Sequence, residues 1–279
     1  MDSKTKVDLQ NKATQVRITA LNMVNRAQSG HIGGSFSVAD ILTVLYHKVM
    51  NVDPKRPKWE GRDRLVMSKG HCTPALYAVL AQVGFFPEED LKDFRETTSY
   101  LSGHAEMNVP GVDMSTGSLG QGLSAAVGMA LAGKLDRADY FVYSIHGDGE
   151  LQEGMIWEAA MTAAKYQLDN LIAIIDDNKL QLDGTVEEIM PSMYPVEDKF
   201  EAFGWHVITC DGHDLDALYS ALQEAREVKG KPIVIIAQTV KGKGVSFMEN
   251  NVSWHGNVPS AEEYEKALAE LEAQLQEVE

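Results

Sequence analysis

The chain has 279 residues, enough for one large α/β domain or two small ones, and its hydrophobic content of 44% supports a substantial core. Its net charge of −16 argues against nucleic acid or an anionic membrane as a partner, its first residues lack the apolar segment of a signal peptide, and no apolar run is long enough to span a membrane. The two cysteines, Cys72 and Cys210, suggest neither a disulfide framework nor a zinc site, which indicates a reducing, cytoplasmic compartment.

Two helices are expected at the start of the chain. Apolar residues recur at intervals of three and four over residues 9–27, which is typical of one helix face, and Gly30 is expected to cap the end of this helix. Ser37 followed by Asp40 resembles a capping box and predicts a second helix that continues to about Met50.

The rest of the chain alternates between strands and helices. Strands are expected at residues 64–67, 140–145, 171–175, 205–209 and 233–237. Helices are expected at residues 74–82, 87–94, 119–135, 151–168 and 215–228, the third of them buried on most sides. Because the strands are continuously apolar rather than alternating, they indicate an α/β fold with a mostly parallel sheet covered by helices on both faces. No internal repeat or linker interrupts the pattern, so residues 1–279 are predicted to form a single domain.

Polar residues follow two neighbouring strands of this sheet. Gly147-Asp148-Gly149 follows the second expected strand and Asn178 follows the third, with a helix between them. Such a βαβ unit is right-handed and parallel, so Asp148 and Asn178 should emerge at the carboxyl edge of the sheet, where ligands bind. Carboxylate and amide oxygens suit Mg²⁺, the two glycines let a phosphate approach the backbone, and a helix that begins near Glu150 favours an anion. The residues alone therefore predict a metal–diphosphate site.

Four turns should share this edge of the sheet, since each follows a parallel strand: residues 68–71, 146–149, 176–178 and 239–244. The last of them, which contains Lys241-Gly242-Lys243-Gly244, lacks the pattern of a phosphate-binding P-loop and is expected to be a flexible loop that could contact substrate. His71 and Cys72 are adjacent in the first turn; they could form a catalytic pair, or Cys72 could be a buried thiol beside a functional histidine.

The Gly-Asp-Gly turn together with Asp177-Asn178 resembles the thiamine diphosphate motif, in which the second element is usually Asn-Asn. The resemblance implies that Mg²⁺, or else Ca²⁺ or Mn²⁺, is bound by Asp148, Asn178 and the main-chain carbonyl of Leu180.

Five further segments resemble the transketolase family: Ser29-Gly30-His31, Ser68-Lys69-Gly70-His71, Ser102-Gly103-His104, Ser115-Thr116-Gly117-Ser118-Leu119-Gly120-Gln121-Gly122 and Trp254-His255-Gly256. On these segments the chain is identified as the N-terminal, diphosphate-binding half of a transketolase. The resemblance implies a sugar channel, near the thiazolium carbon of the cofactor, that is lined by His31, His71, His104 and His255. These histidines would bind hydroxyls and move protons, which suits groups that titrate near neutrality.

The resemblance also implies which residues contact thiamine diphosphate: His71, Gly117, Ser118, Leu119, Gly147, Asp148, Gly149, Glu153 and Asn178. Glu153 has two interpretations. It would face the equivalent glutamate or the second active site across a dimer interface, or it is a solvated or interface-capping carboxylate.

The usual members of the family are much longer, and their second domain binds the aminopyrimidine of the cofactor and supplies a glutamate to its ring nitrogen. The resemblance therefore implies an enzyme split over two chains. This chain would need a partner subunit with the pyrimidine-binding and C-terminal domains, in a heterotetramer of two plus two chains. The enzyme would transfer a two-carbon ketol unit from a ketose phosphate to an aldose acceptor, as in the pentose phosphate pathway. The alternatives are the α subunit of a 2-oxo acid dehydrogenase, another two-chain thiamine enzyme acting on an unusual sugar, and a non-catalytic module that binds metal and diphosphate.

The last segment, residues 260–279, is expected to be a helix. Ser260 with Glu263 forms a second capping box. A heptad-like apolar seam follows, at Ala261, Tyr264, Leu268, Leu271, Leu275 and Val278. This helix could pack on its own domain or dock a second subunit, and it is expected to end at Glu279, as a natural terminus would.

Overall fold

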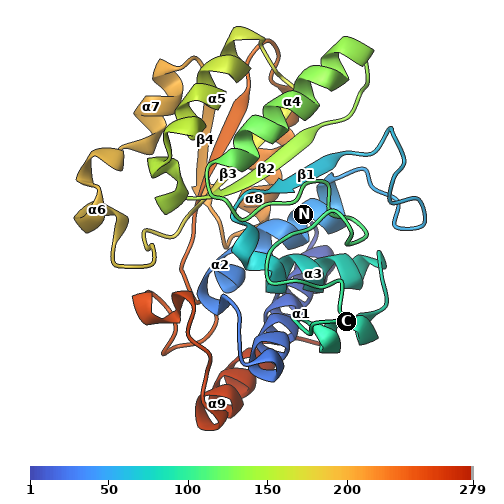
Figure 1. Cartoon of the computed structure of the whole chain (residues 1–279), viewed down its shortest axis with the longest axis vertical. Coiled ribbons are helices and arrows are strands. Elements are labelled where there is room, and N and C mark those ends of the chain that lie inside the picture. The colour runs from blue at the N-terminus through green and yellow to red at the C-terminus, as the bar shows by residue number, and fades with distance from the viewer. Residues whose placement is uncertain (278–279) are drawn as a thin grey trace.

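The structure, a computed structural model that describes residues 1–277, is built around one parallel sheet (Figure 1). Its five strands lie in the order β1-β2-β3-β5-β4, and every neighbouring pair is parallel. Their bounds are β1 Arg64–Met67, β2 Val142–Gly147, β3 Leu171–Asp177, β4 His206–Asp211 and β5 Ile233–Gln238. All five expected strands are therefore present.

Nine α-helices occur in the described part of the chain. They are α1 Ser3–Ala27, α2 Ile32–Val44, α3 Thr73–Val83, α4 Gln121–Asp136, α5 Gly154–Lys165, α6 Val186–Ile189, α7 Val196–Ala202, α8 Leu215–Glu227 and α9 Ala261–Glu272. The helix expected at residues 87–94 is a short 3₁₀ segment, Glu88–Asp93. None of the helices within residues 1–277 combines the length and the apolar character needed to cross a membrane.

Side chains that alternate along the strands feed two separate cores, because successive residues of a strand point to opposite faces of the sheet. Leu65 and Met67 of β1 belong to the core that contains residues of α1, α2, α3 and α8. Val66 between them belongs to the core formed with α4, α5 and α7. Helices thus cover both faces, as expected, and leave the strand ends free to build a site (Figure 1).

The start of the second helix differs from the prediction. α1 is capped at its C-terminus by Gln28, which adopts the left-handed conformation (φ 47°) and whose backbone N–H donates to the carbonyl of Val24, so Gly30 is not the cap. α2 already begins at Ile32. Ser37 lies inside this helix and donates to the buried Asp176, while Asp40 faces Arg17 instead of capping. The polar pair that looked like a helix start is in fact part of buried polar networks.

Two later helices also differ. The residues after Asp148 form a short 3₁₀ turn, Gly149–Gln152, and α5 begins only at Gly154, so the helix expected to begin near Glu150 starts later than predicted. α4 begins at Gln121 and buries only one side. Its opposite side, which includes Leu135 at 75% exposure, faces solvent. The prediction that this helix is buried on most sides is therefore wrong for the isolated chain.

The C-terminal helix packs on its own chain. The capping box of Ser260 and Glu263 is present, and α9 buries Ala267 and Leu271 against residues of α1 and α2. The helix ends at Glu272 rather than Glu279, and Leu275 is 42% exposed. Val278 of the expected seam lies outside the described residues.

Candidate functional site

The carboxyl ends of the strands bring the four predicted turns together. Gly147 at the end of β2 pairs with Asp176 of β3, and Asp177 at the end of β3 pairs with Gln238 at the end of β5. The turns that follow these three strands therefore begin close to one another at the same edge of the sheet. A pocket of about 420 Å³ opens there, within the usual range for a small-molecule site. The predicted site residues that line it are His31, His71, His104, Gly117, Leu119, Gly147, Asp148, Gly149, Glu153, Asn178, Leu180 and His255. Ser118 instead lines an adjacent hollow that also includes His104.

The four predicted histidines form one cluster. The ring centroid of His31 lies 5.0 Å from that of His71, 5.6 Å from His255 and 6.3 Å from His104, and the rings of His71 and His255 stack at 5.3 Å. They come from the start of α2, the turn after β1, the loop before α4 and the segment before α9. Segments that are far apart in the sequence therefore converge on one wall of the pocket.

Burial changes the acid–base character of these histidines. Burial, followed by the charges of Arg95 and His104, lowers the pKa of His31 to about 4. Burial and the Lys241 ammonium lower the pKa of His255 to about 3, and burial and Lys69 hold the pKa of His71 well below its ordinary value. The expectation that the group titrates near neutrality is therefore wrong for these three. They stand neutral at pH 7, each with one ring donor and one ring acceptor.

Asp148 is buried and faces the pocket beside Asn178. Its carboxylate accepts hydrogen bonds from the backbone N–H groups of Gly149 (2.8 Å) and Lys179. The side chain of Asn178 donates to Asp176 at 3.3 Å, and its Oδ1 accepts from the N–H of Leu180 at 3.1 Å. These bonds fix the directions of both side chains at the edge of the sheet.

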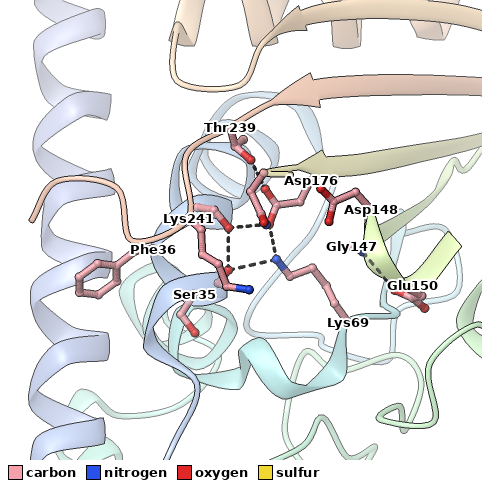
Figure 2. A network of polar contacts seen from close by, with 12 residues as sticks. Ser35, Phe36, Lys69, Gly147, Asp148, Glu150, Asp176, Thr239 and Lys241 are labelled. Atoms are coloured by element: carbon pink, nitrogen blue, oxygen red, sulfur yellow. Dashed lines mark hydrogen bonds and ion pairs between the residues drawn. The ribbon is translucent and has the colours of Figure 1, made fainter. Parts of the chain in front are cut away.

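A buried ion pair lies directly beneath this edge (Figure 2). Lys69, 2% exposed, pairs with the fully buried Asp176, which also accepts from the hydroxyls of Ser37 and Thr239. Burial alone would lower the pKa of Lys69, but the Asp176 carboxylate outweighs it and raises that pKa. The charge of Asp176 is thus compensated within the protein.

The donor set fits a bound cation. Asp176 pairs with Lys69, and Asp177 pairs with Lys179 at 2.6 Å, but Asp148 makes no ion pair with any side chain in residues 1–277. Burial and the two neighbouring aspartates raise the pKa of Asp148 to about 7, which is the signature of a carboxylate short of positive charge. No group of three His, Cys, Asp or Glu side chains with metal-binding geometry occurs in the described chain. The predicted metal site is of a different kind, because only one of its three ligands, Asp148, is a carboxylate. The other two are the side-chain amide of Asn178 and the main-chain carbonyl of Leu180.

Glycines leave space where a cofactor would approach. A Cβ atom added to Gly147 would have no protein atom within 4 Å, so this position borders open pocket. Gly117 adopts a positive φ of 141°, and a Cβ there would lie 2.8 Å from the ring of His104. Glu153 is exposed and lines the pocket beside Gly120, so its carboxylate is available to a neighbouring subunit or to solvent.

Lys241 is the residue whose placement departs most from expectation. It is 2% exposed instead of lying on a flexible loop. Its ammonium donates to the carbonyl of Leu180 at 3.0 Å and to Nδ1 of His255 at 2.8 Å. Burial and the charge of Lys69 lower the pKa of Lys241 to about 8. A cation thus lines the pocket next to the predicted metal ligands.

Polar residues of this site that sequence reasoning missed include Lys69 and Asp176, and it placed Lys241 only in a flexible loop that could contact substrate. Each lies in a turn that was recognised, but the side chains that meet there come from different strands, so no local spacing reveals the pairs. Cys72 is fully buried and burial raises the pKa of its thiol to about 11, which makes it an inert neighbour of His71 rather than a nucleophile.

A pocket lined by histidines, a Gly-Asp-Gly turn and an asparagine at the edge of a parallel sheet is the arrangement of a thiamine diphosphate-binding domain. The sequence matches the description "Transketolase, thiamine diphosphate binding domain" over residues 9–275, and the chain belongs to the transketolase family.

Several relatives show how the chain compares in length. It is 48% identical to the 6-deoxy-6-sulfo-D-fructose transketolase subunit SqwG of Clostridium sp. (strain MSTE9), over 97% of this chain and 98% of that protein. It is 45% identical to a protein of Phocaeicola vulgatus that is named as one subunit of an apulose-4-phosphate transketolase, over 98% of this chain and 96% of that protein. The transketolase structure from Campylobacter jejuni superposes with a TM-score of 0.90 at 38% identity, over 95% of this chain and 42% of that chain. The resemblance to transketolase and the thiamine diphosphate-binding fold are thereby confirmed.

Proposed function

We propose that this chain is the N-terminal, diphosphate-binding subunit of a two-chain transketolase, which transfers a two-carbon ketol unit from a ketose phosphate to an aldose acceptor. The observation that carries the proposal is the convergence of four histidines beside Asp148 and Asn178 in a single pocket. The length of the chain supports it, since the chain matches almost the whole of two relatives that are named as transketolase subunits.

The cofactors of the proposed enzyme are thiamine diphosphate and a divalent cation, Mg²⁺ or else Ca²⁺ or Mn²⁺. Asp148, Asn178 and the carbonyl of Leu180 would bind the cation, since hard oxygen ligands suit it and Asp148 lacks a compensating charge. Gly147 and Gly149 would let the diphosphate approach the backbone. When bound, thiamine diphosphate supplies the electron sink needed to break and form a carbon–carbon bond.

The histidines would bind the sugar and move its protons. Because the Lys241 ammonium donates to Nδ1 of His255, the ring proton of this neutral histidine lies on Nε2, which is then a donor for a sugar oxygen. His31, His71 and His104 surround the same space and would hold further hydroxyls. Because their pKa values are lowered, His31, His71 and His255 are neutral donors and acceptors for hydroxyls at pH 7, and each would be a weak base that readily returns any proton it takes up.

A partner chain would complete the site. Leu119 and Leu182, both at the pocket, are 39% and 62% exposed, so apolar surface borders the place where the aminopyrimidine of the cofactor would lie. We propose that a partner with the pyrimidine-binding and C-terminal domains covers this side, in a cytoplasmic heterotetramer of two plus two chains. The donor and acceptor sugars of this chain stay open, and the pentose phosphate pathway is one setting beside those that the relatives' names suggest.

The alternatives receive less support. The relatives described above are named as transketolases, which does not favour the α subunit of a 2-oxo acid dehydrogenase. A non-catalytic module that binds metal and diphosphate would not need four histidines gathered at one pocket, so their clustering favours a catalytic site.

The test compares the purified chain with the same chain co-purified with its natural partner. Ketol transfer is measured with saturating thiamine diphosphate and Mg²⁺, using ketose phosphates and sulfo- and apulose-type sugars as donors. The chain alone should show no transfer, and added partner should restore it with a dependence on protein concentration that reflects association. Robust transfer by the 279-residue chain alone would overturn the two-chain proposal.

A further inference from the structure

A second network of buried polar side chains lies outside the pocket and is connected to it by a hydrogen bond to the main chain of Val240. Its members are Arg17 of α1, Asp40 of α2 and His213 of the turn between β4 and α8. Arg17 pairs with Asp40, and Nδ1 of His213 lies 2.7 Å from the same carboxylate. The side chains of the three residues are 5%, 9% and 12% exposed, so little water competes for these bonds. His213 does not line the pocket.

The bonds of His213 define its protonation state. The backbone N–H of Val240 donates to Nε2 of His213 at 2.8 Å. Since a backbone N–H can only donate, Nε2 must carry a lone pair, and the single ring proton lies on Nδ1, where it is donated to Asp40. His213 is therefore a neutral imidazole that links a carboxylate on one side to a main-chain N–H on the other.

Val240 stands in the turn that carries Lys241 into the pocket. The contacts that fix this turn include the bond from Val240 to His213, the bond from the N–H of Gly242 to the carbonyl of Gly33 (3.0 Å), and the bond from the side chain of Thr239 to Asp176. The N–H of Thr239 also donates to the carbonyl of Asp177 (3.2 Å), and the carbonyl of Lys241 accepts from the N–H of Asn250 (2.9 Å). The fit is tight, because a Cβ added to Gly33 would lie 3.1 Å from Cγ of Lys241. A shift of Val240 would therefore move the adjacent Lys241.

We propose that His213 is a positioning residue of the site: by accepting the N–H of Val240 it holds the turn at residues 239–244, so that the Lys241 ammonium stays between Leu180 and His255. The proposal rests on the function proposed above, since it assigns the consequence to cofactor binding and ketol transfer. His213 acts on the position of this turn and does not itself line the pocket. Residues that hydrogen-bond directly to a metal ligand typically change affinity or activity by 10–100-fold when they are replaced, and we take this as the upper range for His213, which acts through Val240 and Lys241.

Two substitutions separate this proposal from a purely structural role. His213→Gln keeps an acceptor at the position of Nε2 and loses the donor to Asp40, whereas His213→Asn keeps the donor and loses the acceptor for Val240. Both variants are neutral, as His213 is here. His206→Asn serves as the matched control, because His206 is a partly exposed histidine of β4 that bonds to Glu224 at 3.2 Å, away from the pocket.

The readouts are the thiamine diphosphate concentration for half-saturation of the assembled enzyme and the hydrogen-exchange rate of the Val240 amide in the chain alone. His213→Asn should raise the thiamine diphosphate concentration for half-saturation about 10- to 100-fold and should speed hydrogen exchange at the Val240 amide. His213→Gln and His206→Asn should resemble the unaltered protein in both. If His213→Asn does not fold, retention of both values by His213→Gln still supports the proposal, and their loss overturns it.

Other outcomes also decide. If His213→Gln loses affinity while His213→Asn keeps it, the histidine acts through Asp40 and the proposal is wrong. It is equally wrong if neither variant changes the cofactor requirement. If the unaltered assembled enzyme does not bind thiamine diphosphate, the proposed function fails, while exchange of the Val240 amide still shows whether His213 holds the turn.

Discussion

The buried pair of Lys69 and Asp176 allows a quantitative prediction of stability. Replacing Lys69 by methionine keeps a long unbranched side chain but removes the cation from a site that is 2% exposed. Asp176 is then left as a buried carboxylate whose remaining donors are the hydroxyls of Ser37 and Thr239 and the amide of Asn178. Removing one partner of a buried pair is costly because the other charge stays out of water without compensation.

The expected loss for Lys69→Met is about 3–5 kcal/mol in the free energy of unfolding, the range found when one member of a buried ion pair is removed. That is a large share of the roughly 5–15 kcal/mol by which a domain is usually stable. Urea denaturation at pH 7 measures it. The double variant Lys69→Met/Asp176→Asn should regain part of the loss, because neither charge then remains.

The pH dependence gives an independent check. In the unaltered chain the Lys69 ammonium keeps the pKa of Asp176 below its ordinary value of 3.8, so its stabilising contribution persists at neutral pH and is lost only as the pH falls below that value. In Lys69→Met the folded pKa of Asp176 rises above the unfolded one, so the penalty is present above about pH 4 and disappears as the carboxyl protonates. The deficit of the variant should therefore shrink as the pH is lowered from neutrality toward that value. A loss below about 1 kcal/mol, the scale of an exposed pair, and no pH dependence would refute the reasoning.

Four further predictions follow from the site and the C-terminal helix. Asp148→Ala should abolish Mg²⁺-dependent binding of thiamine diphosphate, measured by calorimetry on the assembled enzyme; unchanged affinity would contradict the metal assignment. In the unaltered enzyme Mg²⁺ affinity should fall between about pH 8 and pH 6, because a carboxyl with a pKa raised to about 7 must lose its proton to bind the ion. Alanine at His71, His104 or His255 should lower kcat on the order of 10²–10⁴-fold and should lower cofactor affinity less than kcat, and full activity in all three would disprove the channel. Leu271→Ala should cost about 2–5 kcal/mol of stability without preventing partner binding, since the side chain is buried within the chain; a selective loss of partner binding would instead favour docking.

The sheet and the meeting of its polar turns at one edge followed from the sequence because both depend on local signals. A short apolar run followed by a polar turn marks the end of a buried parallel strand, and all such turns meet at one edge. That rule places Asp148 and Asn178 together without knowledge of any side-chain contact. The histidines were found through resemblance to a family, since nothing in their spacing shows that His31 and His255 come within 5.6 Å.

Helix starts and buried charges were harder to predict for a common physical reason. Ser37 and Asp40 have the pattern of a capping box, but in the fold they bond to Asp176 and Arg17, which are far away in the sequence. Lys241 was hard to predict for the same reason. A lysine next to glycines is typical of a flexible loop, but in the fold Lys241 is buried, and its hydrogen bond to the carbonyl of Leu180 offsets part of the cost of burying the charge. Long-range partners override local propensity wherever a polar group is buried.

The charges that remain at the pocket indicate the kind of ligand that it suits. Lys69 neutralises Asp176, and burial keeps His31, His71 and His255 uncharged at pH 7, so none of these brings a net charge to the cavity. What is left is the uncompensated carboxylate of Asp148, together with the carboxylates of Glu150 and Glu153, and the ammonium of Lys241, whose turn lies two strands further along the same sheet edge. A simple anion would be repelled by the first, and a simple cation by the second. A ligand that presents a cation and an anion side by side satisfies both, and a metal-bound diphosphate is such a ligand.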